Sequence, residues 1–190
     1  ECGELGRNLY SCVSEKIVQV SSTRAAEMTK LLENTFRAAN IGLINEMAII
    51  CEKLNLDIWE IIEAAKTKPY GYMPFYPGPG LGGHCIPVDP RYLEWKLETI
   101  DSESKFIKLF EEINFSMPNH VVNKSKQIIE NNNLINSIFI LGISYKANVS
   151  DTRESPAIDI MQILEDEKIT FDFNDPHVER VKINGTEYKS

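Results

Sequence analysis

The feature that most constrains the fold is an uninterrupted helical pattern from Arg24 to about Leu54. Its apolar residues recur at helical spacing, without a proline, over about eight turns. They are Met28, Leu31, Leu32, Phe36, Ala39, Leu43, Met47, Ile50 and Leu54. A helix much longer than three or four turns tends to span an interface or form a spine between domains. Because these positions surround the helix more widely than one packing stripe requires, we expect it to form the core of a two-fold dimer.

Shorter elements are expected on either side of this spine helix. Before it, the sequence predicts a helix over Leu5 to Ile17 and a short strand over Lys16 to Val20, closed by turn and cap residues. After it, Asp57 and Glu60 have the spacing of a capping box at the start of a shorter helix.

A proline- and glycine-rich irregular stretch follows over residues 67–90. Helical patterns resume over residues 91–97 and again over residues 106–134. Ser102 is the expected cap of the second of these helices, and Pro118 is expected to kink or divide it.

The pattern changes near residue 136. The apolar run Ser137 to Gly142 is typical of a strand buried on both faces of a parallel sheet. Ser155 and Pro156 predict the start of a helix, and Ile169 to Phe173 predicts a second strand. The residues expected to pack inward from that helix are Ile158, Ile160, Met161, Ile163 and Leu164. This order is a βαβ unit, the opening of a doubly wound domain.

The expected fold class is α/β, with three segments. Residues 1–22 would be the tail of a preceding domain, residues 23–134 a mostly helical central domain with the spine helix, and residues 135–190 the start of the doubly wound domain. The chain begins with Glu1 rather than Met, and its last segment has too few strands to close a sheet. We therefore expect it to be a piece of a longer protein.

Charge and cysteine usage limit the class of protein. The net charge of −8 over 190 residues speaks against nucleic acid and anionic membranes as partners, since both reward clustered Lys and Arg. The sequence has no apolar run of membrane-spanning length and no signal-peptide pattern, so a cytoplasmic protein is expected. Cys2, Cys12, Cys51 and Cys85 include no Cys-x-x-Cys pair, which argues against a zinc site and a disulfide framework.

The run from Pro77 to Pro90 says most about function, because it places Cys85 at the end of a glycine-rich loop and Asp89 one helical turn later. Glycines allow positive φ and close approach of a ligand, while prolines stiffen the flanks. This arrangement suits a thiolate nucleophile; a plain turn with a buried cysteine is the alternative. Asp89 would orient water or accept a proton, or else cap the helix at Arg91. His84 is expected to shape the pocket rather than to form a Cys–His dyad.

The string Gly-Gly-His-Cys-Ile-Pro-Val-Asp-Pro at residues 82–90, preceded by Pro-Gly-Pro-Gly, resembles the catalytic cysteine segment of the UDP-glucose/GDP-mannose dehydrogenase family, in particular its UDP-N-acetylhexosamine branch. The resemblance implies an NAD-dependent enzyme that oxidises C6 of a UDP-sugar to a carboxylate for surface polysaccharide synthesis. It also implies that Cys85 forms a thiohemiacetal and then a thioester. Residues 135–190 would open a Rossmann-like UDP-binding domain.

Two residues of the long helix gain a role only through this resemblance. Lys30 and Asn34 lie four apart on one helix face, where spacing alone favours a solvated surface with Lys30 paired to Glu27 or Glu33. The family's helix carries the same Lys-x-x-x-Asn spacing after a similar Ala-Glu pair. The resemblance therefore implies that Lys30 and Asn34 stabilise an oxyanion at Cys85, and that Glu27 contacts substrate.

Further substrate contacts are implied near the expected βαβ unit. Residues 142–146, followed by residues 151–156, resemble the family's strand-end loop, whose Lys and Arg face the nucleotide sugar or the catalytic cleft. Lys146 and Arg153 are cationic donors beside a helix N-terminus, a favourable place for a diphosphate. Arg153 is also implied in cofactor binding. The other implied substrate-binding residues are Tyr76, Gly78, Gly80, Gly82 and Gly83.

Two departures from the family's pattern bear on activity. UDP-glucose dehydrogenases generally have a Lys where this chain has Val88, so UDP-N-acetylglucosamine is the expected substrate, with UDP-N-acetylmannosamine, its galactosamine relative and UDP-glucose as alternatives. Residues 80–83 lack the spacing of a Gly-x-Gly-x-x-Gly turn, so NAD is expected to bind mainly to an N-terminal domain outside this chain. The rival hypothesis is a non-catalytic module for dimerisation and nucleotide-sugar binding.

Overall fold

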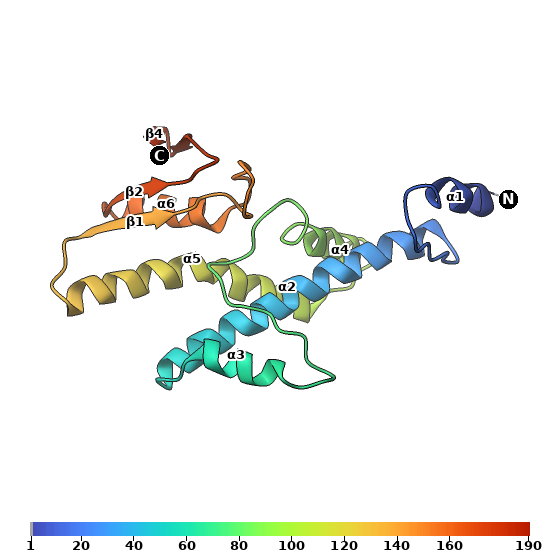
Figure 1. Cartoon of the computed structure of the whole chain (residues 1–190), viewed down its shortest axis with the longest axis horizontal. Coiled ribbons are helices and arrows are strands. Elements are labelled where there is room, and N and C mark those ends of the chain that lie inside the picture. Colours follow the sequence, from blue (N-terminus) through green and yellow to red (C-terminus); the bar gives the residue numbers. More distant parts are fainter. Residues whose placement is uncertain (1) are drawn as a thin grey trace. The chain divides into compact units, whose positions relative to one another are not determined.

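The structure, a computed structural model, describes residues 2–190. It divides into two compact units, residues 2–33 and 34–190; Figure 1 shows the helices and strands along the chain. The first unit holds α1 (Cys2–Tyr10) and the start of α2 (Thr23–Lys53). The second holds the rest of α2, a small α/β part, and the helices α3 (Ile58–Lys66), α4 (Asp89–Glu98) and α5 (Lys105–Asn131).

Two expectations for the first unit are wrong. The helix expected over Leu5 to Ile17 ends at Tyr10, just before Ser11, whose hydroxyl donates to the carbonyl oxygen of Asn8 at 2.7 Å. Serine side chains that bond to nearby backbone groups favour helix ends over helix interiors. Residues 16–20 form no strand, because a strand requires a pairing partner and the described part of this unit contains no other strand.

The long helix expected from Arg24 to Leu54 is confirmed as α2, within one residue at each end. Its start is capped by Ser22, whose hydroxyl accepts from the backbone N–H of Ala25 at 3.1 Å. The buried residues of α2 are mostly small or amide-bearing: Asn34, Ala38, Ala39, Gly42, Asn45 and Cys51. A Cβ added to Gly42 would lie only 3.0 Å from the Cβ of Phe110 on α5. Small residues thus allow α2 and α5 to pack closely.

Helix α3 begins as expected, while α4 begins earlier than expected. The Asp57 carboxylate caps α3 by accepting from the backbone N–H of Trp59 at 2.9 Å. Helix α4 starts at Asp89, with Val88 in the N-cap position. The alternative role of Asp89 as the cap of a helix beginning at Arg91 is therefore wrong.

Helix α5 runs without a break through Pro118, which is buried within it. Of the two expected effects of this proline, division of the helix is therefore wrong, and a kink stays a prediction. The cap is Ser104 rather than Ser102: the Ser104 hydroxyl accepts from the backbone N–H of Ile107 at 3.3 Å. Ser102 instead closes the end of α4 by donating its N–H to the carbonyl oxygen of Leu97. No helix within residues 2–190 is both long and apolar enough to cross a bilayer.

The expected βαβ unit is confirmed. Strands β1 (Ser137–Leu141) and β2 (Thr170–Asn174) pair in parallel, joined by α6 (Pro156–Asp166), which lies against them (Figure 1). The expectation that β1 is buried on both faces is wrong, since Phe139 is 62% and Leu141 80% exposed. These side chains lie on the face that α6 does not cover. The core beside α6 contains Ile143, Ile160, Met161, Leu164, Phe171 and Phe173.

A hairpin of β3 (Arg180–Ile183) and β4 (Thr186–Lys189) follows and was not predicted. Its turn is Asn184-Gly185, with φ of 44° and 98°. Two central residues with positive φ are typical of a type I′ turn, for which Asn-Gly is a preferred pair. The Asn-Gly pair is the sequence signal that indicates this hairpin.

Asp175 joins the ends of the two parallel strands. Its buried carboxylate accepts from the backbone N–H groups of Ile143 (2.8 Å) and Ser144 (3.1 Å), which follow β1. It also accepts from the N–H groups of His177 (2.8 Å) and Val178 (3.1 Å). Burial raises the pKa of this carboxyl, but the hydrogen bonds outweigh burial and lower the pKa to about 2. Asp175 therefore fixes the loop that follows β1.

Asp175→Ala is expected to lower the free energy of unfolding at neutral pH by at least about 1–3 kcal/mol, because buried N–H groups lose their acceptor. Denaturant titration measures this loss. The carboxyl pKa is depressed in the folded state, so its contribution is present above the ordinary pKa of 3.8 and is lost as pH falls toward about 2. The gap between wild type and variant should therefore narrow over that range. Asp172→Ala, exposed on β2, is the control; equal stabilities of all three proteins would contradict the account.

Candidate functional site

Contacts with α2 and α5 hold the first half of the glycine-rich loop in place. The backbone N–H of Gly78 donates to Oδ1 of Asn45 on α2 at 2.9 Å. Gly80 has a φ of 135°, and a Cβ there would lie 3.1 Å from the backbone oxygen of Asn114 on α5. The first half of the loop is therefore set by a hydrogen bond to one helix and by close packing against the other.

The second half of the loop packs against the segment that follows β1. A Cβ added to Gly82 would lie 3.0 Å from the Cβ of Tyr145, and one added to Gly83 would lie 2.8 Å from its ring atoms. The ring centroids of His84 and Tyr145 are 6.3 Å apart in an edge-on arrangement. The space that Gly82 and Gly83 leave is therefore filled by Tyr145 of the same chain.

Cys85 is half-buried and opens the turn into α4. Its carbonyl oxygen accepts from the N–H groups of Val88 at 3.2 Å and Asp89 at 2.8 Å. The Asp89 carboxylate accepts a hydrogen bond from the side-chain amide of Asn34 on α2. The amide oxygen of Asn34 accepts from Nη1 of Arg37 at 2.8 Å. Three predicted catalytic residues, Cys85, Asp89 and Asn34, therefore belong to one connected set of hydrogen bonds.

Lys30 and Glu27 lie on α2 within the first unit, residues 2–33, and both are exposed. Lys30 precedes Asn34 by four residues on the same helix, which places the two on one helix face. The roles expected for Lys30 and Glu27 stay predictions.

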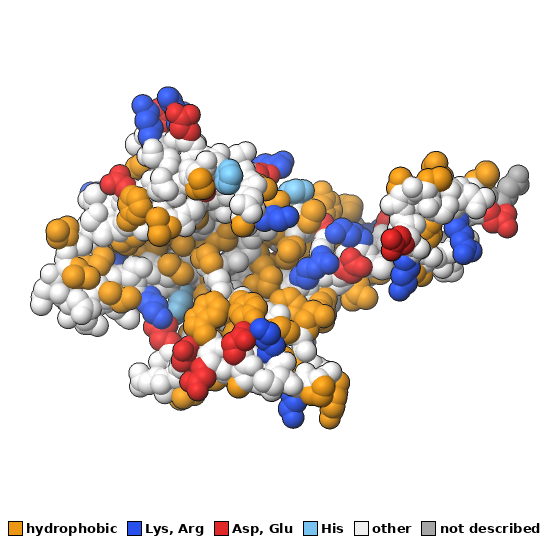
Figure 2. Space-filling model, in the orientation of Figure 1, with side chains coloured by type: hydrophobic (Ala, Val, Ile, Leu, Met, Phe, Trp, Pro, Cys, Tyr) orange, Lys and Arg blue, Asp and Glu red, His pale blue; other side chains and the backbone are white. Residues whose placement is uncertain are grey.

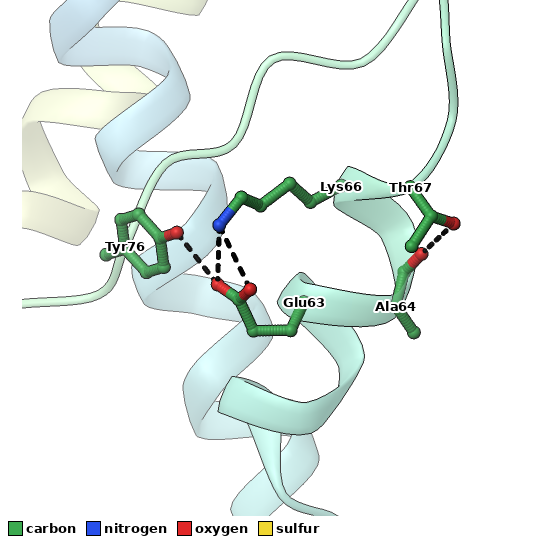
Figure 3. A network of polar contacts seen from close by, with 5 residues as sticks. All are labelled: Glu63, Ala64, Lys66, Thr67 and Tyr76. Atoms are coloured by element: carbon green, nitrogen blue, oxygen red, sulfur yellow. Dashed lines mark hydrogen bonds and ion pairs between the residues drawn. The ribbon is translucent and has the colours of Figure 1, made fainter.

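Tyr76 is bound to α3 (Figure 3). Its ring stacks on that of Trp59 with centroids 5.9 Å apart, and its hydroxyl donates to Oε1 of Glu63 at 2.9 Å. Lys66 Nζ donates to Oε2 of the same carboxylate at 3.0 Å. The hydrogen bonds from Lys66 and Tyr76 lower the pKa of Glu63. Tyr76 thus anchors the start of the glycine-rich loop, while its expected contact with substrate stays a prediction.

The two predicted cations of the segment after β1 lie in different settings. The Arg153 guanidinium binds the Asp151 carboxylate through Nη2 and Oδ2 at 2.6 Å and through Nε and Oδ1 at 3.0 Å. The hydrogen bonds from Arg153 lower the pKa of Asp151 to about 2. Lys146 is exposed and lines a cavity of about 310 Å³ at the carboxyl ends of β1 and β2, which Arg153 does not line. Parallel sheets bind ligands at such strand ends.

A larger cavity of about 690 Å³ lies beside Pro77 to Pro79, between α2, α3, α5 and β1. Figure 2 shows the surface hollowed above α3, with hydrophobic side chains gathered along the edge. One wall carries Glu52, which contacts Lys124 at 3.0 Å and His120 at 3.3 Å. Cys85 lines neither this cavity nor the one at Lys146.

Residues 24–116 match the model of the UDP-glucose/GDP-mannose dehydrogenase family, central domain, and residues 139–190 match the UDP binding domain of that family. The chain belongs to the UDP-glucose/GDP-mannose dehydrogenase family. It is 41% identical over 164 residues to the UDP-N-acetyl-D-mannosamine dehydrogenase of Methanocaldococcus jannaschii, covering 86% of this chain and 37% of that protein. It is 35% identical over 179 residues to the NDP-N-acetyl-D-galactosaminuronic acid dehydrogenase of Ralstonia nicotianae, covering 94% and 41%.

Solved structures of this dehydrogenase family share the fold. The UDP-N-acetyl-mannosamine dehydrogenase Cap5O of Staphylococcus aureus matches with a TM-score of 0.79 and 39% identity, over 97% of this chain and 42% of that chain. The UDP-D-ManNAc dehydrogenase of Pyrococcus horikoshii matches with a TM-score of 0.84 and 33% identity, over 93% and 42%. The chain thus spans about two fifths of the length of the relatives that it matches.

Sequence reasoning missed Asn45, Asn114 and Tyr145, which hold the glycine-rich loop in place. Asn45 follows Asn34 by eleven residues, close to three helical turns, so the two lie on the same face of α2. A polar residue that repeats at this spacing within an apolar helix was the available signal. Asn114 and Tyr145 carry no comparable signal, because their roles depend on which segments pack together.

Gly83→Ala is expected to lower the free energy of unfolding by about 1–3 kcal/mol, because the new Cβ would overlap the Tyr145 ring and because the residue has a φ of 86°. Denaturant titration gives the value. Gly78→Ala is the matched control, since a Cβ there meets nothing within 4 Å. Adding Tyr145→Ala to Gly83→Ala should recover part of the loss; no recovery would show that the ring is not the cause.

Proposed function

We propose that this chain forms the central and carboxyl-terminal part of an NAD-dependent nucleotide-sugar 6-dehydrogenase, which oxidises the C6 alcohol of a UDP-N-acetylhexosamine to a carboxylate. The observation that carries the proposal is the connected set of Cys85, Asp89 and Asn34 in a member of this dehydrogenase family. In this set, the half-buried thiol of Cys85 precedes the Asp89 carboxylate by one helical turn, and the side-chain amide of Asn34 donates a hydrogen bond to that carboxylate. We propose residues 1–22, 23–134 and 135–190 as the tail of an NAD-binding domain, the central domain and part of the UDP-binding domain.

The reaction proceeds through two oxidations at one carbon. The first would remove a hydride from C6 and the proton of the C6 hydroxyl, which passes to water, and would give the C6 aldehyde. The Cys85 thiolate adds to the C6 aldehyde, forming a C–S bond while the carbonyl oxygen takes up a proton, which gives a thiohemiacetal. Loss of a hydride and of that proton gives a thioester. Water then adds to the thioester and the C–S bond breaks, while the two protons of the water pass to Asp89 and to solvent; this releases the carboxylate and restores the thiolate. The covalent link explains why the aldehyde would not be released.

The neighbouring side chains take the roles that this chemistry needs. Lys30 and Asn34 stabilise the negative charge that develops on the C6 oxygen; loss of one such donor typically costs about 2.7–4 kcal/mol of transition-state stabilisation. Asp89 accepts the proton from the attacking water. The amide of Asn34 holds Asp89 in place for that step.

The electron acceptor is proposed to bind mainly outside residues 2–190. Helix α6 begins at Pro156, well after the end of β1 at Leu141, so the described βαβ unit lacks the short glycine-rich turn that places a dinucleotide at a helix N-terminus. These residues therefore do not fit NAD in the usual way. NAD would be held by a domain outside residues 2–190 and would supply the electron acceptor for both oxidations. Arg153 is proposed to reach that cofactor or the substrate diphosphate.

The substrate is a UDP-N-acetylhexosamine. Val88, in place of the Lys of UDP-glucose dehydrogenases, supports an N-acetylated sugar. Relatives named for UDP-N-acetyl-D-mannosamine make that sugar, rather than UDP-N-acetylglucosamine, the first to test. Lys146, on the strand-end cavity, is proposed to bind the diphosphate, together with backbone N–H groups of the glycine-rich loop.

Cys85→Ser in the complete enzyme is expected to abolish formation of the uronic acid, because a serine hydroxyl is a far poorer nucleophile near neutral pH. NADH formation and product analysis measure the effect with UDP-N-acetylmannosamine, UDP-N-acetylglucosamine and UDP-glucose. Cys12→Ser, which changes an exposed cysteine of the first unit, is the matched control and should retain activity. Full activity of Cys85→Ser, or equal rates on all three sugars, would contradict the proposal.

We also propose that α2 forms the core of a homodimer. In the second unit, α2 and the residue that follows it expose a row of large apolar side chains: Phe36, Leu43, Met47 and Ile50, and then Leu54. Their spacings of seven, four, three and four residues are those of a helix–helix seam. A row of large apolar side chains left exposed along one helix supports a second copy of the chain as its partner.

Met47→Glu combined with Ile50→Glu is expected to convert the dimer to a monomer, because the two-fold axis would bring like charges together in an apolar seam. Light scattering coupled to size-exclusion chromatography measures the molar mass. Glu46→Ala, an exposed change on the same helix, should leave the mass unchanged. A monomeric wild type, or a charged variant that stays dimeric, would rule out this interface.

A further inference from the structure

Two buried asparagines connect α2, α5 and the glycine-rich loop. Asn45 is 0% and Asn114 2% exposed. Asn114 Nδ2 donates to the backbone oxygen of Ala38 at 3.1 Å, and Asn114 Oδ1 accepts from Asn45 Nδ2 at 3.0 Å. Asn45 Oδ1 in turn accepts from the backbone N–H of Gly78 at 2.9 Å. The result is a directed chain of three hydrogen bonds that ends on the loop.

The donor-to-acceptor direction of these three hydrogen bonds is fixed at both ends of the series. The carbonyl of Ala38 can only accept, and the N–H of Gly78 can only donate. Turning over the amide of Asn45 would place its NH₂ group against the Gly78 N–H, and turning over that of Asn114 would place its oxygen against the Ala38 oxygen. One orientation of each side chain therefore satisfies every group.

Displacement of the loop would break this arrangement. If Gly78 moved away, Asn45 Oδ1 would be left without a donor in a site where both amides are almost fully buried. An unpaired buried acceptor loses the solvation that it had in the unfolded chain. The buried pair therefore favours a single position for Gly78.

A second attachment on α2 holds the other end of the cysteine segment. Asn34, on the same face of α2 as Asn45, binds the carboxylate of Asp89. The two asparagines are eleven residues apart, a rise of about 16 Å along the helix. Cys85 lies between Gly78 and Asp89 in sequence, so its segment is attached to one helix face at both ends.

We propose that Asn45, supported by Asn114, is a positioning residue that holds the Cys85 loop in the geometry needed for attack on the substrate. The inference rests on the proposed function. It adds a role for residues that contact neither the thiol nor, in the proposed mechanism, the sugar. A rigid attachment matters because small displacements of a nucleophile cost large factors in rate.

The competing explanation is that the pair only stabilises the packing of α2 on α5. The two explanations predict different properties for the folded variant at temperatures below its melting temperature. A positioning role predicts a loosened loop and a slower chemical step, whereas a packing role predicts only a lower melting temperature.

The test uses the complete enzyme and three measurements on Asn45→Ala. The first is the steady-state rate with UDP-N-acetylmannosamine and NAD. The second is the rate of alkylation of Cys85 by iodoacetamide, read from its tryptic peptide so that the other cysteines do not interfere. The third is hydrogen exchange over the segment from Gly78 to Cys85.

Asn45→Ala is expected to lower kcat about tenfold or more with a smaller change in KM. Alkylation of half-buried Cys85 should become several-fold faster, and the Gly78 segment should exchange faster. Asn114→Ala should act in the same direction, and the double variant should lose less than the sum of the two, since both belong to one chain of hydrogen bonds.

Two controls separate positioning from stability. Asn40→Ala removes an amide of α2 that, within residues 2–190, bonds only to the Phe36 carbonyl of its own helix. Val122→Ala opens a cavity in the core beside α6. Both should leave kcat and Cys85 alkylation within about twofold of wild type. If Asn45→Ala fails to fold, Asn114→Ala serves instead: it keeps the Asn45 acceptor for Gly78, removes the amide that fixes the orientation of Asn45, and should show smaller changes in the same direction.

The inference is overturned if Asn45→Ala melts at a lower temperature but keeps kcat and Cys85 alkylation within twofold, or if Val122→Ala changes both equally. Failure of the proposed function is a distinct result. If Cys85→Ser retained full activity, the proposed function would fall, while alkylation and exchange would still report on the loop. An active wild type with an unaffected Asn45→Ala would remove the inference alone.

Discussion

The close packing of α5 against the small-residue face of α2 is the contact on which the position of the cysteine depends. Gly42 has no side chain, and a Cβ there would lie 3.0 Å from Phe110 and 3.1 Å from Nδ2 of Asn114. This closeness lets Asn114 reach both the Ala38 carbonyl and Asn45. A bulkier residue at position 42 would separate the helices and, with them, the attachment of the glycine-rich loop.

The same loop also packs against the α/β part. Gly82 and Gly83 lie against Tyr145, and the Tyr145 N–H donates to the carbonyl oxygen of Asp151 at 3.0 Å. Lys146, on the strand-end cavity, is the next residue after Tyr145. The segment proposed to bind the diphosphate and the segment proposed to perform the chemistry are therefore in direct contact, which suits an enzyme that must bind one part of a nucleotide sugar and oxidise another.

Much of this fold follows from local sequence. The apolar period of α2, the Asp57 cap and the strand–helix–strand order at the carboxyl end are local patterns, and the structure has all three. Two features depend instead on tertiary packing. Composition predicted burial of both faces of β1, but one face is exposed, and Pro118 is buried within α5 without dividing it. The Asn184-Gly185 pair is a local signal for the turn between β3 and β4.

The candidate site likewise has some features that the sequence predicts and others that depend on tertiary packing. The motif around Cys85 and Asp89 and its resemblance to the family indicated the nucleophile segment and singled out Asn34, whose contact with Asp89 spans 55 positions in sequence. Spacing alone could not show that contact, nor the buried pair behind Gly78, because both depend on how α2, α4 and α5 pack. Lys30 and Glu27 keep the roles predicted from the resemblance.

In the proposed mechanism, Cys85 carries the sugar as a thioester between the second oxidation and hydrolysis. The most direct test mixes the complete enzyme, as wild type and as Asp89→Asn, with UDP-N-acetylmannosamine and NAD, quenches in acid and maps the cysteine peptides by mass spectrometry. The Cys85 peptide should carry the added mass of the nucleotide-sugar acyl group, to a greater extent in Asp89→Asn, and hydroxylamine should remove it. Uronic acid formed while the Cys85 peptide stays unmodified in both proteins would contradict the account.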